Sequence, residues 1–171
     1  MLPSMRASVP VLKLTTLAVL LGCGGGGGGG TPLTNPPKLL VSGTQLAAGQ
    51  TRGELEIGMA SEGDGPVLVQ LDLRTDPERI RLTSDPVPLQ GEARSGTVGP
   101  GRYRLLLGDT RTARSPQTLT TGTVARIPFE VLAPGQPAVV EVFAEAVLAA
   151  DAAGKTAPID APRSPALIEI R

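Results

Sequence analysis

Residues 67–74 read VLVQLDLR, and this stretch decides the fold class. Apolar residues occupy its odd positions, at Val67, Val69, Leu71 and Leu73, whereas positions 70, 72 and 74 are polar. A period of two is typical of a β-strand with one face in the core, because successive side chains of a strand point to opposite sides. The stretch therefore predicts a half-buried strand whose odd positions point inward and whose Gln70, Asp72 and Arg74 point outward.

Short apolar runs with the same period follow along the chain, separated by Gly, Pro and Asp. They lie at residues 80–82, 103–107, 127–131 and 139–148. Turn signals such as Thr75–Pro77, Gly99–Gly101 and Asp151–Gly154 divide the chain into segments of strand length. About nine strands fit between Lys38 and Arg171, and their spacing predicts an all-β domain, an antiparallel β-sandwich or jelly roll.

The run at 139–148 is rich in alanine, which also suits a helix, but its valines and Phe143 favour a strand. In that strand the even positions are predicted to point inward, namely Val140, Val142, Ala144, Ala146 and Leu148. Glu141, Phe143 and Glu145 then share the opposite face, and we predict them as a candidate binding face. Tyr103 and Phe129 fall on inward positions, so Phe143 is the one aromatic side chain that the pattern leaves outside the core.

The amino-acid composition excludes several kinds of active site. The chain has no His, no Trp, one Cys, one Tyr and two Phe. Without His there is no Ser-His-Asp triad and no histidine metal site, and one Cys gives neither an internal disulfide nor a thiolate zinc cluster. So few aromatic rings also argue against a surface that stacks nucleic-acid bases or sugars.

Paired carboxylates are the remaining route to catalysis, and the candidate pairs are Glu54 with Glu56 and Glu141 with Glu145. Surface acids on one strand face explain both pairs, so we predict no catalytic residue and a protein that is not an enzyme. Calcium needs six to eight oxygen ligands, and the acidic turns at 62–64 and 151–154 are too sparse for such a cage. We therefore predict no metal site and no cofactor.

The N-terminus has the layout of a secretory signal peptide. Two bases, Arg6 and Lys13, and no acid precede the mostly apolar run Leu14–Leu21. These eight residues fall short of the roughly 20 that a membrane-spanning helix needs. The segment ends in Leu20-Leu21-Gly22-Cys23, which resembles the lipobox of bacterial lipoprotein signal peptides.

This resemblance implies cleavage between Gly22 and Cys23 and the attachment of acyl chains, palmitate among them, to Cys23. Several acyl chains make a lasting membrane anchor, at about 0.8 kcal/mol per buried CH2. Gly24 follows the cysteine where an Asp would retain some lipoproteins in the inner membrane, so the outer membrane stays open as a destination. We expect a lipid-anchored cell-envelope protein with its domain in the periplasm or at the cell surface. The alternative is an ordinary cleaved signal peptide with an incidental cysteine.

Residues 24–37 predict a flexible tether. Seven consecutive glycines, Gly24–Gly30, precede the proline-rich segment Thr31–Pro37. A coil of this length has an end-to-end distance of roughly 20 Å. The predicted organisation is a signal peptide at 1–22, the lipidated cysteine and its tether at 23–37, and the β-sandwich domain at 38–171.

The charge balance gives no reason to expect nucleic acid as a partner. Removal of residues 1–22 leaves 14 Lys and Arg against 16 Asp and Glu, and a near-neutral protein does not attract a polyanion. Arginines nevertheless gather between Arg94 and Arg126, where Asp109 is the only acid. A solvated face explains this stretch. The alternative, which requires the arginines to share a side, is a docking patch for an acidic partner or for anionic lipid head groups.

Gly122–Pro158, GTVARIPFEVLAPGQPAVVEVFAEAVLAADAAGKTAP, resembles the C-terminal half of a cohesin domain. It holds an Ile-x-Phe-x-Val strand, a Pro-Gly turn, a valine-rich strand and an Asp-x-x-Gly turn ahead of a last strand, Ala166–Ile170. Val67–Leu82 resembles the paired cohesin strands that an Asp-Pro turn joins, here Asp76-Pro77. The resemblance covers about residues 38–171.

This resemblance implies a nine-stranded jelly roll related to some carbohydrate-binding modules. Characterised cohesins bind dockerin modules and so gather polysaccharide-degrading enzymes on scaffolds. Cohesin-like domains also occur as single lipoprotein modules, and one module with one anchor is similar to those. The expected function is a membrane-anchored, non-catalytic module that binds another protein, with a dockerin-like partner as one candidate. The alternatives are a glycan-binding module of the same fold and a purely structural envelope lipoprotein.

Overall fold

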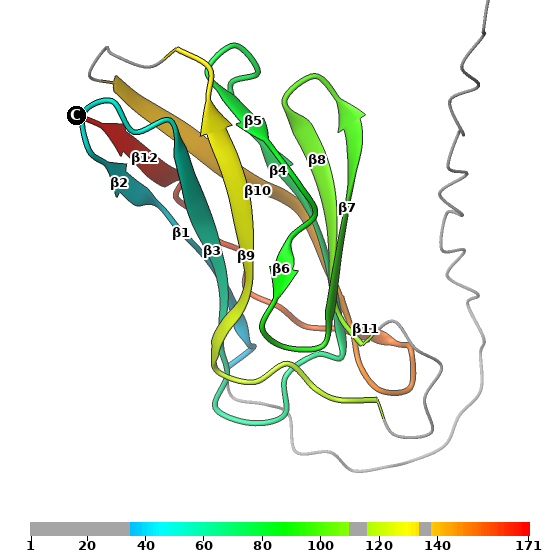
Figure 1. Cartoon of the computed structure of the whole chain (residues 1–171). Coiled ribbons are helices and arrows are strands. Elements are labelled where there is room, and N and C mark those ends of the chain that lie inside the picture. Colours follow the sequence, from blue (N-terminus) through cyan, green and yellow to red (C-terminus); the bar gives the residue numbers. More distant parts are fainter. Residues whose placement is uncertain (1–34, 110–115, 134–137) are drawn as a thin grey trace, which may run out of the picture. The chain divides into compact units, whose positions relative to one another are not determined.

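The computed structural model describes residues 35–109, 116–133 and 138–171, and all regular structure in these ranges is β (Figure 1). Their strands are β1 Lys38–Ser42, β2 Thr44–Leu46, β3 Arg52–Ala60, β4 Leu68–Arg74, β5 Ile80–Leu82, β6 Val87–Pro88, β7 Glu92–Gly99, β8 Arg102–Gly108, β9 Gly122–Val131, β10 Ala138–Ala150, β11 Thr156–Ala157 and β12 Ala166–Ile170. The predicted signal peptide, Cys23, the glycine run and the Pro134-Gly135 turn lie outside the described residues. In those ranges no helix is long and apolar enough to cross a membrane.

The strands form two sheets, which confirms the predicted all-β sandwich. The five-stranded sheet has the order β1-β3-β9-β5, with β6 also paired to β9. The seven-stranded sheet has the order β2-β12-β10-β4-β8-β7, with β11 also paired to β10. The described residues hold 12 strands rather than about nine, because short segments such as β2, β6 and β11 have too little alternation to be recognised in sequence. The strand pairs are antiparallel as predicted, apart from β2 with β12, which is parallel.

The core lies between the two sheets and contains the alternating residues that the sequence predicts. Val69, Leu71 and Leu73 of β4 are fully buried, and so is Phe129 of β9. Tyr103 is half-buried at the same inward phase of β8. All of the buried core described lies within the compact unit 33–171, so this unit carries its own hydrophobic core.

A glycine allows the chain to step from one sheet to the other after β1. A Cβ on Gly43 would lie 1.8 Å from the carbonyl oxygen of Leu167 in β12. No side chain fits at that distance, so glycine is required where β1 of the five-stranded sheet leads into β2 of the seven-stranded sheet. After this step β2 runs parallel to β12.

The Asp76-Pro77 turn also joins the two sheets. The Asp76 carboxylate accepts the Glu78 N–H at 3.0 Å, and the Asp76 carbonyl accepts the Ile80 N–H at 2.9 Å. β4 lies in the seven-stranded sheet, while β5 pairs with β9 in the five-stranded sheet. The expectation that this turn joins two paired strands is therefore wrong, because the tight turn redirects the chain across the core.

β10 is one strand of 13 residues, but its alternation changes phase in the middle. Glu145 pairs with Asp72 and Leu148 pairs with Gln70, so β10 carries one extra residue in a β-bulge. Ala146 in this bulge has a φ of +49°, a left-handed conformation that is rare outside glycine. Leu148 is consequently 56% exposed and Ala149 6% exposed. The predicted inward placement holds for Val142 but is wrong for Ala146 and Leu148, and the side chain of Val140 lies outside those described.

Candidate functional site

The predicted binding face of β10 lies on the outer surface of the seven-stranded sheet. Phe143 lies opposite Arg74 in the register of β10 with β4, and Glu145 lies opposite Asp72. Glu141 is exposed, whereas Phe143 is half-buried. The structure therefore places all three predicted residues on one face, beside the polar positions of β4.

Asp72 is the buried centre of this face. Its exposed fraction is 1%, although it points away from the core. Arg104 of β8, which pairs with Asp72 in register, donates two hydrogen bonds to its carboxylate, from Nε at 2.8 Å and from Nη2 at 3.1 Å. Arg102 Nη2 lies 3.5 Å from the same carboxylate. The hydrogen bonds that Arg104 donates to Asp72 raise the pKa of Arg104 above its usual value, so this guanidinium remains a cation.

Glu145 and Phe143 extend the group across β10. Arg74 Nε lies 3.1 Å from Glu145 Oε1, and Arg102 Nη2 lies 3.7 Å from Glu145 Oε2. The Arg74 guanidinium carbon stands 4.7 Å from the centroid of the Phe143 ring, a cation–π contact. We call Arg74, Arg102 and Arg104, with Asp72, Glu145 and Phe143 beneath or between them, the arginine cluster.

An apolar zone adjoins the arginine cluster on the same face. Leu148 lies opposite Gln70, and Gln70 lies opposite Leu106 of β8. Leu106 and Leu68 are half-buried, and Leu148 is 56% exposed. The bulge in β10 produces this zone, since it turns Leu148 from the core to the surface.

The arginine-rich stretch of the sequence is divided between the two sheets. Arg94 of β7 lies opposite Leu106 and so shares the outer face of the arginine cluster. Arg126 lies on the five-stranded sheet instead, where its Nε is 3.1 Å from Glu56 and 3.9 Å from Glu54. Arg111 and Arg114 lie outside the described residues. The common side that the docking-patch alternative requires is therefore present for Arg94, Arg102 and Arg104 but not for Arg126, and Arg74 joins the first three from outside that stretch.

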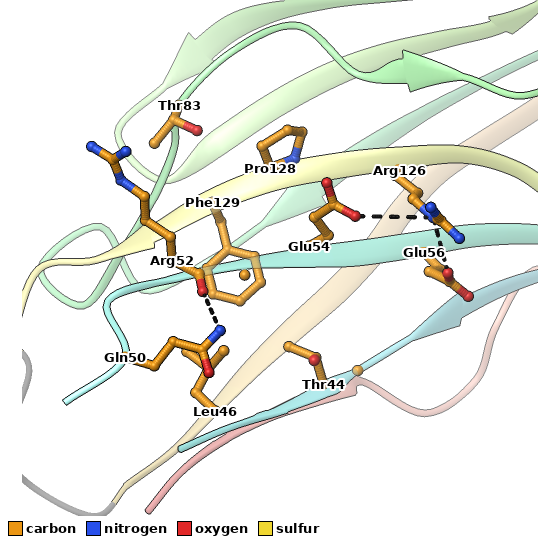
Figure 2. Close-up of a pocket in the computed structure, with 12 residues that line it drawn as sticks. Thr44, Leu46, Gln50, Arg52, Glu54, Glu56, Thr83, Arg126, Pro128 and Phe129 are labelled. Carbon is orange, nitrogen blue, oxygen red and sulfur yellow. Dashed lines mark hydrogen bonds and ion pairs between the residues drawn. The ribbon is translucent and has the colours of Figure 1, made fainter. Parts of the chain in front are cut away.

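The candidate carboxylate pair Glu54 and Glu56 flanks one arginine on the five-stranded sheet. Figure 2 shows both acids joined to Arg126, and these three side chains and Phe129 belong to the lining of a cavity of about 650 Å³. Gln50 closes another side, where its Nε2 donates to the Arg52 carbonyl at 2.9 Å. Glycoside hydrolysis needs two carboxyl groups facing each other across a sugar, and these two are exposed neighbours on one strand.

A second cavity, of about 470 Å³, opens beside the arginine cluster. Its lining consists of Arg74, Thr75, Asp76, Arg79, Val139, Glu141 and Phe143. Arg79 Nε is buried there and has no hydrogen-bond partner among the described residues. This cavity continues the arginine cluster toward the Asp76 turn.

The acidic turns serve local structure. The Asp151 carboxylate accepts the N–H groups of Ala153 and Lys155, each at 2.9 Å, which confirms the predicted turn at 151–154. Glu62 accepts a hydrogen bond from the Asn35 side chain at 3.3 Å. Within the described ranges, no group of three or more His, Cys, Asp or Glu residues is placed to hold a metal ion.

The sequence pattern placed Phe143, Glu141 and Glu145 on one face, as the structure has them, but gave no indication of Asp72 and its arginines as a unit. The alternation assigned Asp72 to the solvent side, and only the pairing of β4 with β8 shows that Arg104 covers it. The available signal was the run of polar outward positions in both strands. It gives no information about which strands are neighbours.

The two-sheet β-sandwich is also found in proteins of known structure. No protein-family model matches the sequence, and no curated protein matches it. The fold is that of cohesin domains. A type I cohesin from Clostridium thermocellum, solved in a cohesin–dockerin complex, has a TM-score of 0.68 at 15% identity and covers 80% of this chain and 100% of its own.

Two further structures show the same likeness. The sixth cohesin of scaffoldin B from Acetivibrio cellulolyticus, solved with a dockerin, has a TM-score of 0.68 at 10% identity and covers 80% of this chain and 100% of its own. A non-cellulosomal cohesin from the archaeon Archaeoglobus fulgidus has a TM-score of 0.63 at 10% identity and covers 80% of this chain and 92% of its own. At these identities the likeness establishes the fold.

Proposed function

We propose that this chain is a non-catalytic binding module that holds a protein partner on the outer face of its seven-stranded sheet. The observation that most directly supports this proposal is the arginine cluster around buried Asp72. A carboxylate at 1% exposure that fixes two arginines on a sheet surface gives a rigid array of hydrogen-bond donors, and Arg is enriched at protein interfaces.

The cohesin fold supports the choice of a protein partner. Cohesins of the same fold were solved in complex with dockerins, so a dockerin-like module is the first candidate. A glycan partner finds less support, since Phe143 on this face is half-buried beneath Arg74 and sugar sites use exposed rings.

We further propose that the module is anchored in the cell envelope through a lipid on Cys23. The support is the Leu-Leu-Gly-Cys sequence at 20–23 and the glycine-rich residues that follow it. The first described residue, Asn35, contacts Glu62 in the connection from β3 to β4. Arg74 lies at the other end of β4, so the chain enters the domain away from the arginine cluster and leaves that cluster accessible to a partner.

Affinity capture tests the binding function. The unit 33–171, immobilised through its N-terminus, is incubated with envelope and secreted proteins of the source cells. We expect reproducible retention of one protein, lost in the Arg102→Glu variant and kept in the matched variant Arg126→Glu on the opposite sheet. Retention on polysaccharide instead would favour the glycan module, and retention of nothing on either material would favour a structural lipoprotein.

Metabolic labelling tests the anchor. Cells that produce the full chain are labelled with a palmitate analogue, and the protein is followed into the detergent phase of a Triton X-114 separation. We expect label and detergent partition for the native chain and loss of both in Cys23→Ser. A Cys23→Ser protein that stays labelled would contradict the anchor.

A further inference from the structure

We infer that the protein partner has an acidic surface, with carboxylates that meet Arg74, Arg94, Arg102 and Arg104 and an apolar side chain that meets Leu148. The inference deepens the proposed function, because it names the chemistry of the partner at the proposed face. It rests on which charges the face exposes, on how its arginines are held, and on the bulge in β10.

Exposure separates the two signs of charge on this face. The exposed side-chain fractions of the arginines are 54% for Arg74, 70% for Arg94, 47% for Arg102 and 34% for Arg104. The acids paired with them are less exposed, at 2% for Asp72, 35% for Glu145 and 25% for Glu92. Glu141 of β10, which lies opposite β12, is the exposed exception on this face. Over β4, β8 and β7 the paired carboxylates are less exposed than the guanidinium groups, so a partner approaching these strands meets mainly positive charge.

On the five-stranded sheet the pair of Arg81, 61% exposed, with Glu130, 24% exposed, shows this separation, but the group around Arg126 does not. Arg126 is 46% exposed, and its partners Glu54 and Glu56 are 52% and 45% exposed. A partner of either sign would meet a like charge there. Like-charge contacts oppose association, so charge complementarity favours an acidic partner on the seven-stranded sheet and no charged partner at Arg126.

The arginines are also held in place before binding. Arg104 makes two hydrogen bonds to Asp72, and Arg102 bridges Asp72 and Glu145. Gly96 of β7 lies opposite Arg104, and a Cβ at Gly96 would meet no atom within 4 Å. Arg104 therefore has open space on its β7 side. Guanidinium groups fixed in this way lose little conformational entropy when a carboxylate binds.

The bulge supplies the apolar part of the surface. Ala146 adopts a left-handed φ of +49°, which is unfavourable for a residue with a Cβ. The result of this bulge is that Leu148 faces outward opposite Gln70, with Leu106 on the strand beyond. β-bulges often redirect a side chain at a binding site, and Leu148, on the same outer face as the arginines, gives this face an anchor for an apolar side chain.

Titration with defined peptides tests this inference. The unit 33–171, labelled with ¹⁵N, is titrated with a peptide that repeats Glu-Glu-Leu and with its twin that repeats Gln-Gln-Leu. We expect the acidic peptide to shift the signals of Arg94, Arg102 and Arg104 more than those of Arg81 and Arg126, and the twin to bind at least about tenfold more weakly.

Two variants of equal charge give the matched comparison. We expect the double variant Arg94→Gln and Arg102→Gln to bind the acidic peptide about tenfold more weakly than the native unit. The double variant Arg81→Gln and Arg126→Gln is expected to change this affinity by less than about twofold. Leu148→Ser is expected to lower the affinity for both peptides. Equal losses in the two double variants, or equal binding of the twin peptides, would overturn the inference.

Two outcomes distinguish an acidic protein partner from a lipid surface and from a protein partner that does not use the arginines. Binding to phosphatidylglycerol vesicles that depends on Arg94 and Arg102, without binding of the acidic peptide, would replace the protein partner by a lipid surface and overturn the inference. If affinity capture retains a protein whose binding is unchanged in the Arg94→Gln and Arg102→Gln double variant, the acidic partner is wrong while the proposed function stands.

Discussion

The outer faces of both sheets carry arginine–carboxylate pairs, but the carboxylates of Glu56 and Asp72 differ in how deeply they are buried. On the five-stranded sheet Glu56 is 45% exposed beside Arg126, and on the seven-stranded sheet Asp72 is 2% exposed beneath Arg104. An aspartate side chain is one methylene shorter than a glutamate, so its carboxylate stays close to the sheet while long arginines from the next strand cover it. The comparison indicates that an aspartate opposite an arginine is buried beneath it and holds the guanidinium group in place, whereas a glutamate at such a position stays in solvent.

The largest expected difference between the two outer faces comes from removing the cover of Asp72. Arg104→Leu leaves this buried carboxylate with Arg102 at 3.5 Å as its remaining cation. An unpaired buried charge costs several kcal/mol, and the partial exposure of Arg104 reduces this, so we expect a loss of about 2–3 kcal/mol in the free energy of unfolding. Urea denaturation of the unit 33–171 measures it.

Arg126→Leu on the opposite sheet is the matched control for that substitution. Its acids Glu54 and Glu56 are solvated, so we expect a loss below about 1 kcal/mol. Equal losses for Arg104→Leu and Arg126→Leu would show that the two faces do not differ in the way the burial of Asp72 indicates.

The second prediction compares a glycine in each sheet. A Cβ on Gly53 of β3 would lie 2.7 Å from Phe129 Cζ and 2.9 Å from Leu46 Cδ2, so Gly53→Ala overpacks the core. We expect a loss of about 1–3 kcal/mol, read from the same denaturation curves. Gly96→Ala in β7 meets nothing within 4 Å and is expected to be neutral or to stabilise by about 0.5 kcal/mol. A neutral Gly53→Ala would be inconsistent with the packing of Phe129 beneath β3.

The third prediction concerns the bulge in β10, where Ala146 is the one non-glycine residue of the described ranges with a positive φ. Ala146→Gly relieves the left-handed conformation and is expected to stabilise by about 0.5–1 kcal/mol. Ala146→Val places a β-branched residue at the same φ of +49° and is expected to destabilise by at least about 1 kcal/mol. Thermal unfolding of both variants checks the signs, and stabilisation by valine would contradict the bulge.

Much of the fold follows from alternation alone, and the bulge shows where that reasoning stops. The inward positions of β4 and the last strand Ala166–Ile170 agree with the sequence pattern. Leu148 does not, because an inserted residue reverses every later position of a strand and an alanine at the bulge carries no sequence signal. A glycine at position 146 would have indicated a bulge in the sequence.

The candidate site could be predicted only in part for a related reason. A strand pattern shows that Phe143 and Glu145 share a side, but it does not show which strand lies next to them. The contact of Arg74 with Phe143 and the cover of Asp72 by Arg104 depend on the order β10-β4-β8. That order is set by packing across the whole domain, so the individual residues carry no record of it.

The smallest expected effect tests the outward direction of Leu148 directly. Leu148 is 56% exposed, whereas Leu71, on the β4 strand that faces the bulge, is fully buried. We expect Leu148→Ser to change the free energy of unfolding by less than about 0.5 kcal/mol, and the same replacement at Leu71 to cost at least about 3 kcal/mol. If both variants lose the same stability, the simple alternation of β10 holds in solution and Leu148 belongs to the core. The apolar zone would then be absent from the outer face, leaving the arginine cluster as the only feature that distinguishes it from the five-stranded sheet.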